Sequence, residues 1–387
     1  MKHILFFLGF FFFVISFQSC SKRSQQVFEI GKTITIPYHP DMYSPLESFV
    51  SKVTVIPLET NDNCLIGQRI MFSVKFHQNL FYISFREKLL VFDLNGNFVR
   101  EIGRKGAGPG EFIEVRDFIF TDNNTIELLD FLKIDSYTME GKHIDSKRFN
   151  YMGTNFHCNP MNFCRSYSSG YYLWGGVIYH DEELREKCNL MYRINSDMQI
   201  ENGYFSQKYG DGGWQNRFKY YKDITMFAPS AYDYNVYQID NKDSIKIRYS
   251  FDFGEYSFDS SKDVDRQYIS HEGYVRDIHD YHETERFIYF HITHQNYIHN
   301  LLYSKITGQT YIQSLKQAVS RKDFGLYNCE ALYNDQLVAV VDVSYIKHYL
   351  KRMSHEEIKK WGFEELHKLD DEANPILIIY KIMEKSF

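Results

Sequence analysis

The hydrophobic pattern of the chain consists of short apolar runs that end at turn residues, and the clearest example lies in residues 89–112. There, an apolar run from Leu89 to Leu94 is followed by Asn95-Gly96 and then by a second short run. Apolar strands on both sides of Asn-Gly indicate a β-hairpin, because both central residues of a type I′ turn need a positive φ. A glycine-rich stretch, residues 103–112, then leads to the next unit.

The same phrase, a short strand with a central aromatic residue followed by a turn, recurs along the chain. The six aromatic residues are Phe92, Tyr137, Tyr192, Tyr237, Tyr303 and Tyr380. The first two lie 45 positions apart and the last two lie 77 apart. A period of about 40–50 residues per group of short strands is typical of a β-propeller blade. The pattern predicts an all-β, six-bladed β-propeller whose longer intervals are insertions, and a large antiparallel sandwich is the alternative.

The positions of the repeated phrase also predict the limits of the blades. The blades are expected at about residues 66–103, 112–150, 155–206, 218–254, 268–316 and from 324 onward. Apolar residues at roughly helical spacing interrupt the last blade at 345–369 and predict one or two short helices there. Early strands are predicted at 27–38 and 49–58. Because propellers remove exposed edges by pairing strands from both chain ends, we expect residues 53–58 to pair with 375–383.

The N-terminus has the pattern of an export signal. Lys2 and His3 precede an apolar run at 4–17, which is too short to span a bilayer and matches the core of a secretory signal. The run ends in SFQSC, in which Ser19-Cys20 resembles the bacterial lipobox, where the cysteine carries the lipid. We therefore expect a lipoprotein, with ordinary cleavage or an uncleaved anchor as alternatives.

This interpretation divides the chain into three parts. Residues 1–20 are predicted to be a lipoprotein signal peptide that ends at the lipidated Cys20, residues 21–26 a tether, and residues 27–387 one six-bladed propeller domain. Acyl chains contribute about 0.8 kcal/mol per buried CH₂, so a multiply acylated cysteine would anchor the protein firmly to a membrane.

Composition and charge exclude some classes of function. Of 387 residues, 31 are Tyr and 33 are Phe, and aromatic side chains suit the half-buried faces of strands. The net charge of −6 argues against a nucleic-acid-binding protein, which usually has a basic face. The glycine-rich stretch lies between strands and contains Pro109, so it does not open a helix as a phosphate-binding loop would. We expect no cofactor.

Five cysteines remain when Cys20 is assigned to the lipid: Cys64, Cys158, Cys164, Cys188 and Cys329. An odd number leaves at least one of them unpaired in an exported chain. Cys158 and Cys164 could close a small loop. A zinc site is less favoured, because the chain has no Cys-x-x-Cys pair.

Several motifs together resemble a known group of proteins. These are the lipobox, VFDLNGNFVREIG at 91–103, GRKGAGPGEF at 103–112 with VRDF at 115–118, and NPILIIYKI at 374–382. The combination resembles the six-bladed β-propeller lipoproteins of gut anaerobes, which are similar in fold to NHL-repeat propellers. The resemblance implies a fold and an envelope location, but no reaction and no catalytic residues.

The segment after Cys20 bears on which side of the membrane the protein faces. Surface-exported lipoproteins of such bacteria often have acidic residues soon after the cysteine, and residues 21–26 carry Lys22 and Arg23 but no acid. We therefore expect an outer-membrane lipoprotein that faces the periplasm.

The glycine-rich stretch is the sharpest motif, and a structural role accounts for it. Glycines permit a positive φ, Pro109 restricts one, and Glu111 can accept backbone N–H groups within the loop. The functional alternative is that Arg104, Lys105 and Arg116 form a positive rim for an anionic ligand.

Two tryptophans are further candidates for a ligand rim. Trp174 and Trp214 each lie beside a pair of glycines, where an indole on a loop could stack on a sugar ring or a peptide. The alternative is that each fills a gap between blades.

The predicted fifth blade is rich in histidine. Its histidines are His271, His279, His282, His291, His294 and His299, and the neighbouring acids are Asp277, Asp280, Glu283 and Glu285. His291 and His294 would point to opposite faces of a strand, because strand side chains alternate. A half-buried sheet surface is therefore favoured over a metal site, and we expect no bound metal.

Asp93, Asp130 and Asp240 lie in or next to the repeated phrases, where they are expected to accept turn N–H groups. The chain contains neither G-x-S-x-G nor H-E-x-x-H, so standard serine hydrolases and zinc proteases lose support. Catalytic residues stay unknown. The favoured hypothesis is a lipid-anchored, non-enzymatic binding or scaffold module for an envelope protein, peptide or glycan. The alternative is a metal-dependent lyase or lactonase-like hydrolase with its site at the central channel.

Overall fold

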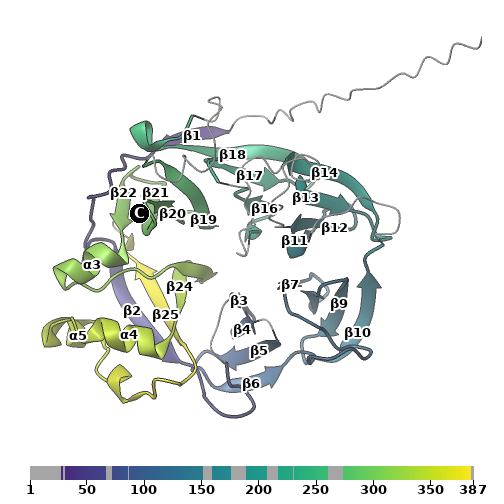
Figure 1. Cartoon of the computed structure of the whole chain (residues 1–387), viewed down its shortest axis with the longest axis horizontal. Coiled ribbons are helices and arrows are strands. Elements are labelled where there is room, and N and C mark those ends of the chain that lie inside the picture. Colours follow the sequence, from purple (N-terminus) through teal and green to yellow (C-terminus); the bar gives the residue numbers. More distant parts are fainter. Residues whose placement is uncertain are drawn as a thin grey trace, which may run out of the picture.

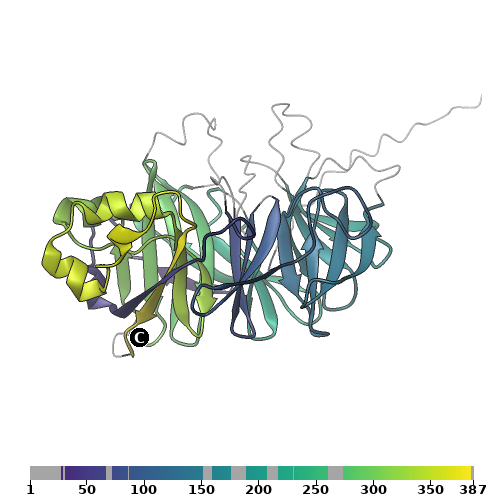
Figure 2. The same ribbon diagram turned by 90° about the horizontal axis from the view of Figure 1, so that it is seen from below.

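Six small antiparallel sheets are arranged in a ring around a common axis (Figure 1). The computed structural model describes residues 28, 31–66, 72–85, 87–150, 159–175, 189–206, 217–229, 231–259 and 273–384. Seen from the side, the ring is a disc (Figure 2). The predicted six-bladed β-propeller is confirmed, because a sandwich would place its strands in two stacked sheets.

Each blade is a sheet of four consecutive strands in the first five cases. The first blade contains β3 (Phe72–His77), β4 (Leu80–Phe85), β5 (Lys88–Asp93) and β6 (Phe98–Glu101). The second contains β7 (Asp117–Phe120), β8 (Thr125–Leu129), β9 (Lys133–Thr138) and β10 (His143–Arg148). The third contains β11 (Pro160–Arg165), β12 (Tyr171–Gly175), β13 (Asn189–Ile194) and β14 (Ile200–Ser206).

The remaining blades follow in chain order around the ring. The fourth contains β15 (Lys219–Tyr221), β16 (Ile224–Phe227), β17 (Asn235–Ile239) and β18 (Ile245–Asp252). The fifth contains β19 (Val275–Glu283), β20 (Phe287–His294), β21 (Tyr297–Ser304) and β22 (Thr310–Gln313). The sixth contains β23 (Cys329–Tyr333), β24 (Gln336–Val341) and β25 (Ile376–Ile382). The first strand of a blade lies nearest the axis, as β3, β7 and β19 show in Figure 1.

The ring is closed by an N-terminal strand. β2 (Val50–Pro57) pairs antiparallel with β25 as the outermost strand of the sixth blade, with Val53 opposite Tyr380 and Ile56 opposite Leu377. This confirms the predicted pairing of the two chain ends. β2 thereby gives the sixth blade a fourth strand and pairs the edge of β25 that would otherwise be open.

A second N-terminal strand has a partner that was not predicted. β1 (Lys32–Thr35) pairs in parallel with β18 and adds a fifth strand to the fourth blade, with Thr35 opposite Asp252. Residues between β1 and β2 then include a short 3₁₀ helix, η1 (Leu46–Ser48). The apolar pattern shows that a strand exists, but it does not contain the identity of a partner some 200 residues away.

Helices lie on the outer side of the sixth blade (Figures 1 and 2). α4 (Val343–Leu350), α5 (His355–Trp361) and η3 (Leu366–Lys368) connect β24 to β25 and confirm the predicted helical insertion. α3 (Leu315–Arg321), between β22 and β23, was not predicted. The hydroxyls of Ser314 and Ser354 accept the first-turn N–H groups of α3 and α5, which is the usual role of an N-cap serine. A further 3₁₀ turn, η2 (Gly254–Tyr256), follows β18.

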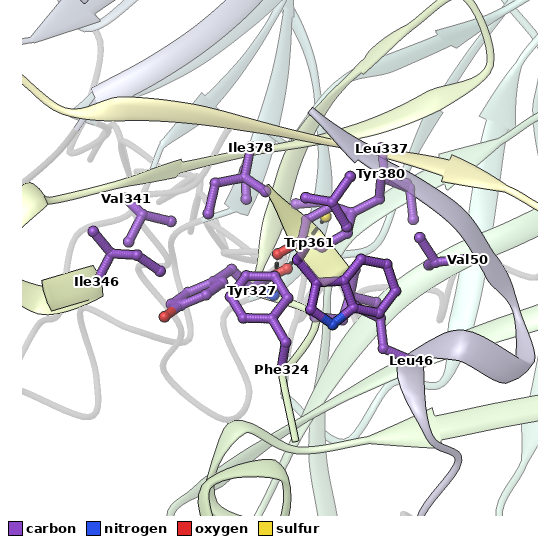
Figure 3. Close-up of a cluster of buried hydrophobic side chains, with 14 of the residues drawn as sticks. Leu46, Val50, Phe324, Tyr327, Leu337, Val341, Ile346, Trp361, Ile378 and Tyr380 are labelled. Carbon is purple, nitrogen blue, oxygen red and sulfur yellow. Dashed lines mark hydrogen bonds between the residues drawn. The ribbon is translucent and has the colours of Figure 1, made fainter. Parts of the chain in front are cut away.

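The largest apolar cluster joins these helices to the sheet. Figure 3 shows Trp361 and Ile346 of the insertion beside Phe324, Tyr327 and Tyr380. Tyr380 is one of the six repeated aromatic residues, and all of them except the half-buried Tyr303 are buried. The repeated phrase is therefore a packing signal, because each blade needs a bulky side chain to fill the space beside the next blade.

Among the residues that the structure describes, no helix has the length and apolar character needed to cross a bilayer. Cys20, the predicted signal peptide and the predicted tether lie outside the described residues.

Candidate functional site

The glycine-rich loop between β6 and β7 is held by its own backbone. Gly106 N donates to Phe112 O at 2.9 Å, and Phe112 N donates to Arg104 O at 3.1 Å. Gly108 N donates to Glu111 Oε2 at 2.8 Å. A Cβ at Gly106 would overlap this carboxylate. The predicted structural role of the loop is confirmed, since Glu111 accepts a backbone N–H that the loop itself presents.

Glu111 also binds the first cation of the predicted rim. Its Oε1 accepts from Arg104 Nε at 2.7 Å, and the rest of the Arg104 side chain is exposed. The hydrogen bond from the Gly108 N–H lowers the pKa of Glu111, and the Arg104 guanidinium acts in the same direction. Lys105 is half-exposed and pairs with Glu87. Arg104 and Lys105 thus lie at the surface, each beside a carboxylate.

Arg116 does not belong to an exposed rim. Its side chain is buried, its Nη1 donates to Pro160 O at 3.0 Å and to Asn159, and its guanidinium lies 4.5 Å from the centre of the Phe131 ring. This buried position does not support the alternative in which Arg116 offers its charge to an anionic ligand. It joins the second blade to the third instead, because a buried guanidinium needs several acceptors.

The two predicted rim tryptophans have different outcomes. Trp174 is fully buried, with its ring 6.0 Å from that of Phe227 and 5.5 Å from the Arg217 guanidinium. It therefore fills the space between the third and fourth blades, which was the alternative interpretation, and cannot stack on a ligand at the rim. Trp214 lies outside the described residues.

Three exposed apolar side chains lie where the glycine-rich loop meets the second blade. Ile113 is 58% exposed, Phe131 is 45% exposed and Leu132 is 44% exposed. Phe131 and Leu132 occupy the turn between β8 and β9, where polar residues are usual. We name Ile113, Phe131 and Leu132 the blade-two patch. This patch was not predicted, although two consecutive apolar residues at a hairpin turn were a usable signal in the sequence.

Hydrogen bonds to a buried aspartate fix the backbone of the blade-two patch. Asp130 is buried, and its carboxylate accepts Ile113 N at 3.1 Å, Glu114 N at 3.0 Å and Phe131 N at 2.6 Å. The Arg116 guanidinium covers one face of the Phe131 ring. Because the loop and the turn share these anchors, the exposed side chains have a fixed backbone beneath them.

The other predicted turn aspartates have similar roles. Asp93 Oδ1 accepts Asn95 N at 2.8 Å and Asn97 N at 2.9 Å, and Asp240 Oδ1 accepts Lys242 N at 2.9 Å and Ser244 N at 3.0 Å. These bonds confirm that the aspartates of the repeated phrases stabilise turns.

The histidines of the fifth blade fall into two groups. His279 and His291 lie together, with ring centres 5.2 Å apart, and His279 Nε2 lies 2.7 Å from Asp277 Oδ2. His294 lies on the opposite face of β20, where its Nδ1 contacts Tyr38 Oη at 3.0 Å. The ring of His299 lies 5.6 Å from that of Tyr38. The predicted opposition of His291 and His294 is confirmed.

His282 lies beside Tyr289, with their ring centres 6.1 Å apart. His271 lies outside the described residues. Within the described ranges, no group of three or more His, Cys, Asp or Glu side chains has an arrangement that could hold a metal ion. Burial lowers the pKa of His291 and of His299 to about 4, and the pKa of His282 falls well below its usual value for the same reason.

Cysteines in the described part of the chain are buried free thiols, namely Cys64, Cys164 and Cys329. Cys164 therefore does not form the small loop with Cys158 that the spacing allowed. Burial raises the pKa of the Cys164 and Cys329 thiols well above the usual value, so both are protonated and unreactive at neutral pH.

The chain matches the model of a known protein family. Residues 34–381 match the model for the family described as Domain of unknown function (DUF4934). The chain belongs to this family. The match begins in β1 and ends in β25, so it covers all six blades.

A solved structure shares the fold of this DUF4934 chain. A Bacteroides fragilis protein described as exported is similar over 91% of this chain and 100% of its own, with 19% identity and a TM-score of 0.70. The extracellular domain of a hybrid two-component system from Bacteroides thetaiotaomicron is similar over 72% of this chain and 32% of its own, with 12% identity and a TM-score of 0.38. The first likeness shows the fold alone, and the second is too distant to support an argument. No curated protein matches the chain.

Proposed function

We propose that this protein is a lipid-anchored protein of the cell envelope whose propeller binds a protein, peptide or glycan partner without catalysing a reaction. The observation that carries the proposal is the blade-two patch, in which an aromatic and two aliphatic side chains are exposed on a rigid backbone. Exposed aromatic and aliphatic groups next to arginine are typical of the centres of protein interfaces. The patch therefore favours a protein or peptide over a glycan.

Rigidity makes the patch suited to binding. The hydrogen bonds that the Asp130 carboxylate accepts and the stacking of Arg116 on Phe131 restrict the turn before any partner arrives. A preordered surface loses less conformational entropy on association, so more of the contact energy remains as affinity. Arg104 and Lys105, on the adjoining loop, would lie at the polar margin of such an interface.

The proposed location is the outer membrane, with the propeller facing the periplasm. It is supported by the lipobox around Cys20, by the absence of acidic residues from 21–26, and by the likeness to a Bacteroides fragilis protein described as exported. The membrane would then be bound by the lipid at Cys20, and the propeller itself would be free to meet other envelope proteins.

The alternative proposal is a metal-dependent lyase or lactonase-like hydrolase with its site near the axis. It requires His, Asp or Glu side chains from several blades to converge on one point. Elemental analysis of the purified protein distinguishes the two proposals. Stoichiometric zinc, calcium or manganese would favour the enzyme. Removal of the metal should then abolish the lyase or hydrolase activity.

Substitution within the patch tests the binding proposal. The protein is immobilised, incubated with envelope proteins of its own organism, and each retained protein is identified and its affinity then measured with purified material. Phe131→Ser with Leu132→Ser should weaken binding of the identified partner about tenfold or more, the usual effect of losing a hot spot. Tyr297→Ser with Ile298→Ser is the matched control, because these neighbours are similarly exposed on the fifth blade. Equal affinities for the wild type and both variants would contradict the proposal.

A further inference from the structure

The outer strand of the second blade has an open edge. Within the described residues, β10 is hydrogen-bonded only to β9, and it lies at the rim of the disc (Figure 1). Five of its six residues are exposed, among them Ile144 at 52%. The other outer strands are shorter or partly covered, because β1, β6 and β22 have four residues each, β2 contacts α5, and Phe28 packs on Phe205 of β14. β10 therefore offers the longest uncovered edge.

The rim of a blade in this fold accepts a further strand. On the fourth blade, β1 pairs with β18, which would otherwise be the outermost strand of its sheet. The added strand, Lys32–Thr35, comes from the same chain. Another backbone thus fits beside the last strand of a blade, and β10 has no such neighbour in the described ranges.

The register of β10 on β9 decides which backbone groups face the open edge. Phe149 N donates to Leu132 O at 3.0 Å, and the same register continues without a shift as far as Ser146. Hydrogen-bonded and non-hydrogen-bonded residues alternate along an antiparallel pair. The N–H and C=O groups of Lys147 therefore point to β9, whereas those of Arg148 and Ser146 point outward.

Three exposed charges accompany these outward groups, namely Asp145, Lys147 and Arg148. None of them forms an ion pair with another described residue. Lysine on an edge strand usually opposes pairing with a further strand, because it repels cations and holds water at the edge. A partner strand that carries a carboxylate opposite Lys147 removes this obstacle. β10 itself carries such a carboxylate, on Asp145.

A second copy of β10 provides the carboxylate in one antiparallel register. Outward-facing residues must lie opposite each other, so Ser146 meets either Ser146 or Arg148 of the other copy. With Ser146 opposite Ser146, each Lys147 lies opposite an Asp145, and two-fold symmetry produces this pair twice. With Ser146 opposite Arg148, the two Lys147 side chains face each other. Facing opposite charges stabilise a strand pair and facing like charges destabilise it, so the first register is favoured.

We propose that this protein forms a symmetric dimer in which the β10 strands of two copies pair antiparallel, with Ser146 at the two-fold axis. The two four-stranded blades then form one continuous sheet. In this register Arg148 also lies beside the exposed Ile144 of the other copy. An arginine stem covers apolar surface while its guanidinium stays in water, so the pairing buries an apolar side chain as well as satisfying the charges.

The dimer is weak in solution, because one pair of short strands buries less area than a standard interface. We expect a dissociation constant of about 10–100 µM. Chains held in one membrane by the proposed lipid at Cys20 would have a higher effective concentration. The pairing itself depends neither on that anchor nor on the blade-two patch, so its failure leaves the proposed binding function standing.

Exchange of charges across the pair tests the proposal. The full chain in detergent, with micelles in excess over protein, is followed by sedimentation velocity from about 1 to 300 µM, a range that brackets the expected dissociation constant. Lys147→Asp, and separately Asp145→Lys, should each raise the dissociation constant about tenfold or more, because two facing pairs become like-charged. The double variant Asp145→Lys with Lys147→Asp restores opposite charges and should dimerise as the wild type does.

Cross-linking tests the position of the two-fold axis. Ser146→Cys places two thiols opposite each other, with Cα atoms about 5.5 Å apart, within reach of a short bis-maleimide reagent. We expect a covalent dimer on denaturing gels. Asn202→Cys is the matched control, because Asn202 is exposed on β14, the outer strand of the third blade. It should give no more cross-linked dimer than the wild type.

The blade-two patch provides a second control. Phe131→Ser with Leu132→Ser should leave the dimer unchanged, and loss of the dimer in this variant would place self-association at the patch and overturn the proposal. A chain that stays monomeric over the whole range of concentration would also overturn it. The same holds for a dimer that both single charge changes leave intact, and for a double variant that stays monomeric.

Discussion

At the scale of single residues, the molecule buries neutral histidines that elsewhere would titrate near physiological pH. His291 is 2% exposed, and desolvation lowers its pKa to about 4, because its ring lacks the hydrogen bonds to water that would stabilise a charge. His299 is lowered to about 4 for the same reason. The unfolded chain would restore both to about 6.5.

This difference predicts that acid destabilises the fold. Between the unfolded and folded pKa values, the unfolded state binds a proton that the folded His291 does not, so stability is present above pH 6.5 and is lost as the pH falls towards 4. At about pH 5 the loss is about 2 kcal/mol for each such histidine. Urea unfolding at about pH 7.5 and at about pH 5 measures this loss. His291→Gln should reduce the difference between the two pH values, and the exposed His367→Gln should not.

At the scale of secondary-structure elements, the turns of one blade support the strands of the next. In the first blade, the Asn95-Gly96 turn packs against the end of β2 of the sixth, and Glu59 N, just after β2, donates to Gly96 O at 2.8 Å. Gly96 has a φ of 86°, and a Cβ there would overlap the carbonyl oxygen of Pro57. The glycine thus serves two purposes, because it permits the turn and allows the close approach of β2.

Two glycine substitutions separate these purposes. Gly96→Ala adds both backbone strain and the collision with Pro57, and should destabilise the fold by about 3 kcal/mol. Gly362→Ala is the control, because Gly362 has a similar φ of 75° with nothing within 4 Å of the added Cβ. It should cost about 1 kcal/mol. Equal losses in urea unfolding would show that the contact with β2 tolerates the methyl group.

At the scale of the whole molecule, the ring depends on the pairing of β2 with β25. Without β2, the β25 edge would be exposed, together with apolar side chains such as Ile378 and Tyr380 that are now buried. Exposed edges of this kind promote aggregation and remove the cooperativity of a closed ring.

Truncation tests this dependence. A variant that starts at residue 59 should lose the cooperative thermal transition and aggregate, as followed by circular dichroism and size-exclusion chromatography. A variant that starts at residue 28 retains β1 and β2 and should unfold in one transition, as expected for the single domain predicted over 27–387. Identical melting curves for the two would show that β2 is dispensable.

The proposed anchor is also a property of the whole molecule. Cys20→Ser should move the protein from the membrane fraction to the soluble fraction, because it removes the site of lipid attachment. Mass spectrometry of the wild-type N-terminal peptide should find Cys20 as the first residue with acyl chains attached. An unmodified Cys20 in a membrane-bound protein would instead indicate an uncleaved anchor.

Local patterns in the sequence were sufficient to predict the all-β class and the six blades. The Asn95-Gly96 turn depends on backbone dihedrals, and the repeated aromatic residues depend on packing beside the strand that carries them. Both requirements determine the residue types within a few positions of the chain. The closing pair of β2 and β25 followed from a general rule about edges. The helices at 345–369 followed from helical spacing of apolar residues.

Tertiary structure alone decided the candidate sites. Arg116 was one of three cations that could have formed an exposed rim, but it is buried against Pro160. The parallel partner of β1 is β18, and the Lys219 ammonium of β15 donates to the backbone carbonyl of Glu330 in β23. Burial and pairing of this kind depend on residues that are distant in the chain, and the sequence states the chemistry of each side chain without stating its neighbours. The bulge in β19 illustrates this limit, because only the register of β19 against β20 reveals it.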